Sequence, residues 1–136
     1  MKITGARKHE ARLKRLTSAK ARAEVTKALF VGGAEIELEA EHSITEGSIS
    51  GAGHIPSAPG QPPNADSRLL DTSIDTTVQG QSPPKVNVTS NAPYSASLEF
   101  GTSKMAERPF MRPAAKKKRG AVAKHVADAL DRVNRR

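Results

Sequence analysis

The histidines and the acidic residues are the side chains of this sequence that could do chemistry, and their spacing offers few sites. The four histidines are scattered without the spacing of metal ligands, at His9, His42, His54 and His125. Glu39 and Glu46 lie at helical offsets from His42, which makes this trio the best metal-binding candidate. We expect solvated helix charges there rather than a metal site.

A second acidic group, Asp66, Asp71 and Asp75, flanks a proline-rich stretch and a strand candidate. We expect Asp71 and Asp75 on the wet edge of a hairpin rather than in an acid–base pair. The sequence has no nucleophile-elbow serine, phosphate-binding loop or dinucleotide fingerprint, and no cysteine for a thiol nucleophile, zinc–thiolate site or disulfide. These observations predict a protein that is not an enzyme and that needs no cofactor.

Charge is distributed unevenly over the 136 residues, whose formal net charge is +8. Residues 1–27 hold nine Lys or Arg against two acids, residues 104–136 hold eleven against three, and five Glu without a base occupy residues 35–46. Basic ends and an acidic middle suit a nucleic acid or a neighbouring subunit of opposite polarity. Solvated helix faces are the plain alternative.

The basic patch of Lys116, Lys117, Lys118 and Arg119 falls near the expected start of a helix, where cations do not complement the helix dipole. An external anion or an acidic neighbour would explain it, and residues 35–46 are one candidate partner. A phosphate group of a nucleic acid is another candidate partner for these cations. No aromatic stacking platform and no helix-turn-helix or zinc-finger spacing accompanies the patch, so we expect no sequence-specific readout of nucleic acid.

Aromatic residues make up only 3% of the sequence, with no Trp. Because aromatic side chains dominate most cores, the core of this single domain should be thin and aliphatic. A subunit of this kind can obtain further burial from its neighbours, which is the first indication of an oligomer. The N-terminus is polar and basic, and no apolar run is long enough to span a bilayer, so we expect neither a signal peptide nor a membrane partner.

Residues 6–46 are predicted to be helical. One apolar stripe follows helical spacing and a second lies on roughly the opposite side: Leu13, Leu16, Ala23, Phe30 and Ala34 in the first, and Val25, Leu29 and Ile36 in the second. Gly32-Gly33 interrupts the pattern, and the alternation over 35–41 also fits a strand. We favour a helix that continues to about Ser43 and is kinked or weakened at the glycines.

Residues 47–66 are rich in Gly, Pro and Ser, a composition that no regular element survives. An irregular segment of this length is usually a functional arm or a mobile loop. We favour an arm that lies across a neighbouring subunit, because proline lowers the entropic cost of ordering an extended segment. Its candidate contact residues are Pro56, Pro59, Gly60, Pro62 and Pro63.

Residues 67–113 contain the strand candidates, 72–79 and 85–90, which predict an antiparallel hairpin with its turn at 80–84. Residues 91–100 could be a short helix capped at Asn91 or a third strand. A C-terminal helix should start at Pro113 and reach about 134, with one apolar stripe formed by Val122, Val126, Leu130 and Val133. The predicted fold class is α+β.

Two blocks in the second half of the sequence resemble a known family. Residues 92–102 read Ala-Pro-Tyr-Ser-Ala-Ser-Leu-Glu-Phe-Gly-Thr, and residues 108–114 read Arg-Pro-Phe-Met-Arg-Pro-Ala. They resemble the Ala-x-Tyr-Ala-x-x-x-Glu-Phe-Gly-Thr and Pro-Phe-x-x-Pro-Ala blocks of the neck and tail-completion proteins of long-tailed bacteriophages and prophages. Residues 57–63 and 69–74 are similar to that family's region upstream. Ser95 departs from the family's usual Ala, and residues before 57 carry no signature.

The blocks also have a physical interpretation. Gly101 permits a positive φ at a sharp turn. Tyr94, Phe100 and Phe110 should form the aromatic centre of the core, and Glu99 should cap a backbone amide or pair with Arg108 or Arg112. The motif residues that we expect in the core or at an interface are Tyr94, Leu98, Glu99, Phe100, Gly101, Thr102, Pro109, Phe110 and Pro113.

The resemblance implies a structural subunit of the virion neck that is assembled in the cytoplasm of the host bacterium. The resemblance implies a homo-oligomeric ring that completes the tail or joins it to the head. A six-fold ring is favoured, with a twelve-fold or partial ring as the alternatives. The implied partners are head-closure, tail-terminator or tail-tube proteins, with DNA passing through the lumen without sequence-specific contacts. The alternatives are a small basic nucleic-acid-associated protein for packaging or regulation, or a morphogenesis factor that is not retained in the virion.

Overall fold

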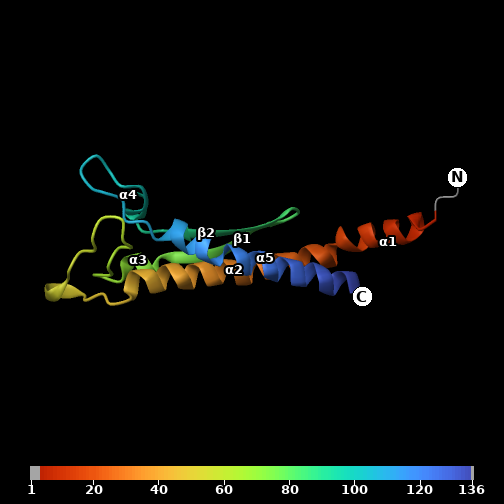
Figure 1. Ribbon diagram of the computed structural model, residues 1–136, viewed down its shortest axis with the longest axis horizontal. Coiled ribbons are helices and arrows are strands. Elements are labelled where there is room, and N and C mark those ends of the chain that lie inside the picture. The colour runs from red at the N-terminus through yellow and green to blue at the C-terminus, as the bar shows by residue number, and fades with distance from the viewer. Residues whose placement is uncertain (1–3, 136) are drawn as a thin grey trace.

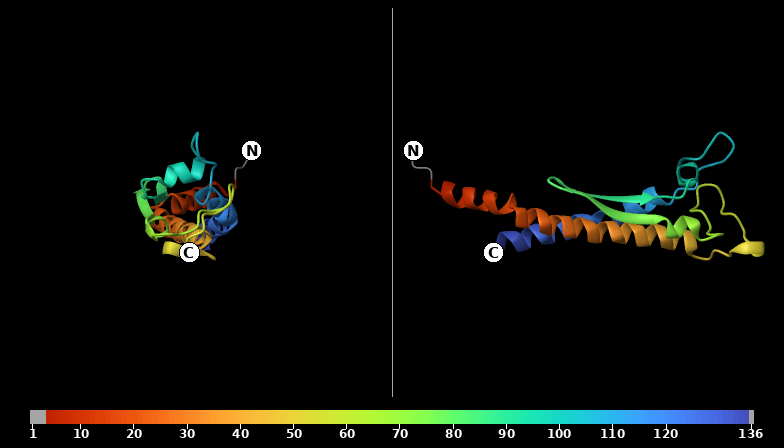
Figure 2. Two further views of the ribbon diagram at one scale, coloured as in Figure 1. Left: turned by 90° about the vertical axis from the view of Figure 1, so that its left-hand side faces the viewer. Right: turned by 180° about the vertical axis from the view of Figure 1, so that it is seen from behind.

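A computed structural model describes residues 4–135 of the chain. Two long helices, α2 (Ala19–Thr45) and α5 (Met111–Arg135), run antiparallel and side by side, and a β-hairpin lies along α2 (Figure 1). The hairpin is formed by β1 (Ile74–Gln81) and β2 (Pro84–Ser90). The fold is therefore α+β, as the sequence predicted. Its shape is a rod, with loops at one end and helix α1 (Ala6–Leu16) at the other (Figure 2).

The predicted N-terminal helix is divided in two at Thr17 and Ser18. The Thr17 hydroxyl donates to the carbonyl oxygen of Leu13, and the Ser18 hydroxyl accepts the amide of Ala21 at 3.1 Å, which caps the start of α2. Helix α2 then continues through Gly32-Gly33 to Thr45. The helical interpretation of residues 35–41 is confirmed, and the strand interpretation is wrong.

The two glycines let both neighbours of α2 approach closely. A Cβ at Gly32 would lie 2.8 Å from Cγ2 of Val122 in α5, and a Cβ at Gly33 would lie 2.7 Å from Cγ2 of Thr76 in β1. Both distances are shorter than real Cβ contacts. The glycine pair therefore marks where α5 and the hairpin pack on two sides of α2.

The first predicted apolar stripe of the N-terminal region does not describe the buried face, whereas Val25, Leu29 and Ile36 of the second stripe are half-buried, and Ile36 packs against the core. Leu13 is 49% exposed, Phe30 is 42% exposed, and Ala23 is also on the surface. The buried face of α2 uses small side chains instead, including Ala21 and Ala28, because close helix packing leaves no room for larger ones. Beyond them lies a small core that is aliphatic except for one Phe: Ala40, Ile44, Ala65, Leu70, Ile74, Ala92, Phe110 and Ala114.

The hairpin is confirmed, with shifted boundaries. Strand β1 pairs with β2 from Ile74↔Ser90 to Gln81↔Pro84, with an irregularity between Val78 and Gly80. Thr72 belongs to the short helix α3 (Leu69–Thr72) rather than to the strand. The strand residues that alternate toward α2 are mostly apolar, whereas those on the other face are polar: Asp75, Thr77, Gln79, Lys85, Asn87 and Thr89.

Residues 91–100 form a short helix, α4 (Ser95–Phe100), so the third-strand alternative is wrong. Asn91 is not its cap, because its side-chain amide donates to Asp75 Oδ2 at 2.8 Å. Helix α5 begins at Met111, two residues before the predicted start at Pro113. Within its apolar stripe, Val133 is buried and the other three residues are half-buried.

Residues 47–66 are irregular apart from the single turn η1 (Gly51–Gly53), as predicted. Their end is tied to the rod, because the Ala65 amide donates to the carbonyl oxygen of Ile44 at 2.9 Å. Among residues 4–135, no helix is both long and apolar enough to cross a membrane.

Candidate functional site

The arrangement around Glu99 is a joint between α4 and the start of α5. Glu99 is 5% exposed, and both of its carboxylate oxygens are used. Oε2 accepts the backbone amides of Phe110 at 2.8 Å and Met111 at 3.0 Å, and Oε1 accepts the amide and Nε of Arg112, both at 2.9 Å. The carboxylate thus satisfies three amides at the N-terminus of α5 that have no helical partner.

The electrostatics of the joint favour the charged form of Glu99. Burial raises the pKa of this carboxyl, but the hydrogen bonds from the amides of Phe110, Arg112 and Met111 and from the Arg112 side chain outweigh it. The net pKa lies below the ordinary value of 4.5. A negative charge is also favoured by the dipole of α5. The expectation that Glu99 caps a backbone amide or pairs with an Arg is confirmed, and the Arg is Arg112.

Arg112 links the joint to the loop between α4 and α5. Its guanidinium reaches the carbonyl oxygen of Glu99 at 2.8 Å and the carboxylate of Glu107 at 2.9 Å, and its Cζ lies 5.1 Å from the centre of the Phe100 ring. Arg108 does not contact the Glu99 carboxylate. Its amide donates to the carbonyl oxygen of Leu98, and its Nε donates to the carbonyl oxygen of Ser57.

Gly101 provides the turn that brings α4 back toward α5. Its φ is +74°, and a Cβ there would lie 2.9 Å from both the amide nitrogen of Glu107 and the carbonyl oxygen of Met105. Only glycine fits both the conformation and the space. Thr102 follows and pairs with Met105 through an isolated bridge. Gly101 and Thr102 therefore shape the loop that carries Glu107 to Arg112.

The prediction that Tyr94, Phe100 and Phe110 together form the aromatic centre of the core is wrong. Phe110 is 1% exposed and fills the core, but Tyr94 is 40% exposed and Phe100 is 67% exposed. Glu99 points inward while Phe100, the next residue of α4, is exposed, because successive residues of a helix face different directions. Tyr94 lies at the N-cap of α4 and lines the groove described below. Pro109 is half-buried and Pro113 is exposed in the first turn of α5. The motif thus combines a buried joint with two displayed rings.

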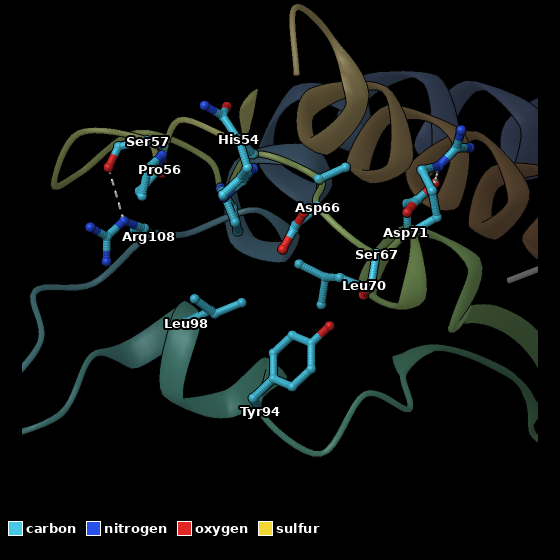
Figure 3. A pocket seen from close by; sticks show the side chains of 14 residues that line it. His54, Pro56, Ser57, Asp66, Ser67, Leu70, Asp71, Tyr94, Leu98 and Arg108 are labelled. Atoms are coloured by element: carbon cyan, nitrogen blue, oxygen red, sulfur yellow. Dashed lines mark hydrogen bonds and ion pairs between the residues drawn. The ribbon is translucent and has the colours of Figure 1, made fainter. Parts of the chain in front are cut away.

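A groove of about 430 Å³ separates α4 from the proline-rich segment and α3. Tyr94 and Leu98 point from α4 toward Leu70, while His54 and Asp66 lie on the opposite wall (Figure 3). Its volume is within the range that holds a small ligand or a few side chains of a partner. Sequence analysis did not identify this groove, because it forms between segments far apart in the chain.

Asp71 on the wall of the groove is buried, which contradicts the predicted position on a wet hairpin edge. It is 3% exposed, and Oδ2 accepts Nε of Arg68 at 2.6 Å, while Oδ1 is buried with no hydrogen-bond partner among the described residues. The i,i+3 spacing of Arg68 and Asp71 could have indicated the pair. Asp75 is exposed, as predicted.

The five candidate residues of the predicted arm do not behave alike. Pro56, Pro59 and Gly60 are exposed, Pro62 is half-buried, and Pro63 is buried. The segment is held to its own chain by the Arg108–Ser57 contact and by the Gly60 amide, which donates to the carbonyl oxygen of Glu107 at 3.0 Å. Near the end of the segment, Pro63 and Ala65 are buried, whereas most residues of the stretch 50–61 are exposed.

Two residues of the basic patch, Lys117 and Lys118, lie close to an acid of the predicted acidic segment. Lys117 Nζ lies 2.6 Å from Glu39 Oε1, which lowers the pKa of Glu39, and Lys118 Nζ lies 3.8 Å from Oε2 of the same residue. Lys116 and Arg119 are exposed. This ion pair ties α5 to α2, and a second tie is His125 Nε2 at 2.7 Å from Glu35 Oε1.

The candidate metal trio is not brought together. Exposed His42 lies 3.4 Å from Glu46 at the end of α2, whereas Glu39 turns to Lys117. Within residues 4–135, no group of three possible ligands could hold a metal ion. The described side chains offer packing surfaces, ion pairs and the groove beside α4.

Comparison with known proteins adds no relative: no family model, no curated protein and no solved structure matches this chain.

Proposed function

We propose that this protein is a structural subunit of the neck of a tailed phage, where copies form a ring that completes the tail or joins it to the head. The proposal begins from the resemblance of residues 92–102 and 108–114 to that class of proteins. The structure supplies a physical reason for these blocks. Glu99, Gly101 and Phe110 build a rigid joint, and Tyr94 and Phe100 are displayed from it.

The observation that carries the proposal is the pair of aromatic side chains exposed on this locked joint. Phe100 is 67% exposed and Tyr94 is 40% exposed, although the chain has only four Phe and Tyr in total. Aromatic residues on a rigid support are the usual anchors of protein interfaces, because little conformational entropy is lost when they are buried. A joint that displays such anchors fits a role in assembly.

The surface area of the chain supports the same function. The accessible surface is 9196 Å², whereas a globular monomer of 14.5 kDa exposes about 6,900 Å². The excess is roughly 2,300 Å², and a ring subunit with two standard interfaces buries about 800 Å² in each. The rod therefore has enough additional surface for a neighbour on either side.

In this function the partners are further copies of the chain, with a six-fold ring as the favoured form, and the adjacent head-closure, tail-terminator or tail-tube proteins. The ring would be retained in the virion after assembly in the host cytoplasm, and DNA would pass through its lumen without sequence-specific contacts. The exposed stretch 50–61 is a candidate arm onto a neighbour, as the sequence predicted.

Replacing Phe100 with Gln tests the proposal. Phe100 is mostly exposed, so the monomer should stay folded, while the concentration needed for assembly should rise about tenfold or more. Lys104→Gln is the matched control, because Lys104 is an exposed residue of the following loop. Sedimentation of both variants gives their masses. Unchanged assembly of Phe100→Gln would remove the support that the displayed rings give to this function.

A further inference from the structure

One side of α2 displays large apolar side chains that the described chain leaves largely uncovered. Phe30, Val31 and Leu38 are 42%, 47% and 63% exposed. They share a face with half-buried Ala34, because residues three, four or seven apart lie on the same side of a helix. Helix α5 and the hairpin pack on other sides of α2, so this face lies along the outside of the rod (Figures 1 and 2).

Charges of opposite sign lie at the two ends of this face. Lys27 stands seven residues before Ala34. Its side chain is 75% exposed, and its one ion pair among residues 4–135 joins Nζ to Glu24 Oε1 at 3.5 Å. Half-buried Glu41 stands seven residues after Ala34 and has no ion pair within the same described range. The α2 face is therefore apolar in the middle and charged at its ends, and it comprises Lys27, Phe30, Val31, Ala34, Leu38 and Glu41.

The surroundings of Glu41 favour the approach of a cation from another molecule. Burial raises the pKa of its carboxyl, and the negative charges of Glu37 and Asp71 raise it further, although Arg68 lowers it. Arg68 itself is held by Asp71, whose Oδ2 accepts its Nε at 2.6 Å. A further cation beside Glu41 would offset both the burial and the like charges.

The α2 face is complementary to itself in an antiparallel pair of helices that cross at Ala34. A two-fold axis there relates each residue to the one equally far on the other side of Ala34. Lys27 then lies opposite Glu41 of the second copy and Phe30 lies opposite Leu38, so each contact occurs twice. The small Ala34 side chain lets the two backbones approach closely. A parallel pair would instead place like charges opposite each other, which is unfavourable.

We propose that the α2 face of one copy binds the α2 face of a second copy in this antiparallel arrangement. The contact closes at two copies. It therefore goes beyond the proposed ring, whose candidate contacts are the displayed rings and the stretch 50–61. A ring that joins a head to a tail has two different sides, which a two-fold pair lacks, so the pair is the form of the free chain below the concentration at which rings assemble. A nucleic acid suits this face less well, because Glu41 would repel phosphates.

Disulfide trapping tests the register, because the chain has no cysteine. Full-length Ala34→Cys protein is oxidised below the concentration of ring assembly, and the cross-linked dimer is quantified on a denaturing gel. Leu38→Cys is the matched control: Leu38 is more exposed, but its two copies would lie eight residues apart along the pair, about 12 Å, which is beyond the roughly 7 Å that a disulfide spans between Cα atoms. We expect at least about tenfold more dimer from Ala34→Cys. Equal yields would overturn the inference and leave the face to a different partner.

A charge swap tests the ion pairs by sedimentation at low salt. Lys27→Glu and Glu41→Lys should each raise the Kd of the pair about tenfold, because each replaces two attractions by two repulsions. The combined variant should restore the Kd, since it only exchanges the two charges. Lys20→Glu is the control, because it makes the same charge change at an exposed residue of α2 whose counterpart in the pair, Ser48, is uncharged. A combined variant that pairs no better than the single variants would overturn the assigned register.

The pair and the ring can fail separately. Phe100→Gln should weaken ring assembly and leave the pair unchanged, because Phe100 lies on α4 and outside the α2 face. Normal rings from a chain whose Ala34→Cys variant shows no enrichment would overturn the pair and leave the ring proposal standing. A pair that forms as described in a chain that never assembles further would overturn the ring and leave the pair.

Discussion

Replacing Glu99 with Ala should destabilise the protein more than any other substitution of an acidic residue described above. The change removes the acceptor of four hydrogen bonds and leaves the amides of Phe110, Met111 and Arg112 without a partner. Loss of one partner from a buried charged network costs about 3–5 kcal/mol, and each unsatisfied amide costs about 1–3 kcal/mol in full burial. Because Arg112 is partly exposed and admits water, we expect a loss of about 3–5 kcal/mol in total.

Urea denaturation at pH 7, followed by circular dichroism, measures this change in the free energy of unfolding. Glu99→Gln should lose less, about 2 kcal/mol, because its amide keeps the shape and one oxygen acceptor. Glu107→Ala is the control. It also removes a carboxylate from Arg112, but Glu107 is 53% exposed, so the loss should be under about 1 kcal/mol. If Glu99→Ala lowers the free energy of unfolding by less than about 1 kcal/mol, the carboxylate does not hold α4 to α5 as described.

The pKa of the same carboxylate predicts how the stability of the fold changes with pH. The pKa of Glu99 in the folded protein lies below its ordinary value of 4.5. Its stabilising contribution is therefore fully present above pH 4.5 and is lost as the pH falls through the lower folded pKa. The difference in unfolding free energy between wild type and Glu99→Gln should shrink from pH 6 to pH 3. A difference that stays constant across this range would contradict the assigned charge.

Three glycine substitutions and one ion-pair substitution give further tests by the same unfolding assay. Gly32→Ala should cost about 1–2 kcal/mol, because its Cβ would overlap the stiff Val122 side chain, whereas Gly120→Ala, with nothing within 4 Å of the new Cβ, should gain about 0.5–1 kcal/mol of helix propensity. Gly101→Ala should cost about 1–3 kcal/mol through its positive φ and the backbone atoms 2.9 Å away. Glu39→Gln should make unfolding less sensitive to acid, because the lowered pKa of Glu39 adds stability that is lost on acidification. The opposite sign in any of these would contradict the packing or charge assigned to that residue.

The sequence predicted those features that depend on local pattern or on an unusual charge. Alternation and turn residues indicated the hairpin, and the position of Lys117 at the start of a helix indicated an acidic neighbour, which is Glu39. Glu99 was identified because it is the one charged residue within the block 92–102, and it does cap backbone amides of α5.

Features that depend on close packing could not be predicted in the same way. The buried face of α2 consists mostly of Ala and Gly, whose small side chains give little periodic hydrophobic signal. The stripe predicted from the pattern therefore included larger residues, such as Phe30, that are exposed. Burial of Asp71 depends on α3 folding back on α2, which no local spacing encodes. Tyr94 and Phe100 were assigned to the core because they are aromatic, but both are exposed, Phe100 because it follows the buried Glu99 on α4.

The proposal of a ring is tested most directly by the mass and symmetry of the purified full-length chain. Light scattering over a range of concentrations at low and moderate salt, with and without duplex DNA, is combined with class averages from electron microscopy. The account predicts a closed ring of copies, six in the favoured form, that persists at moderate salt and forms without DNA. A monomer that binds DNA at low salt and releases it at moderate salt would contradict the ring and assign the chain to nucleic-acid association.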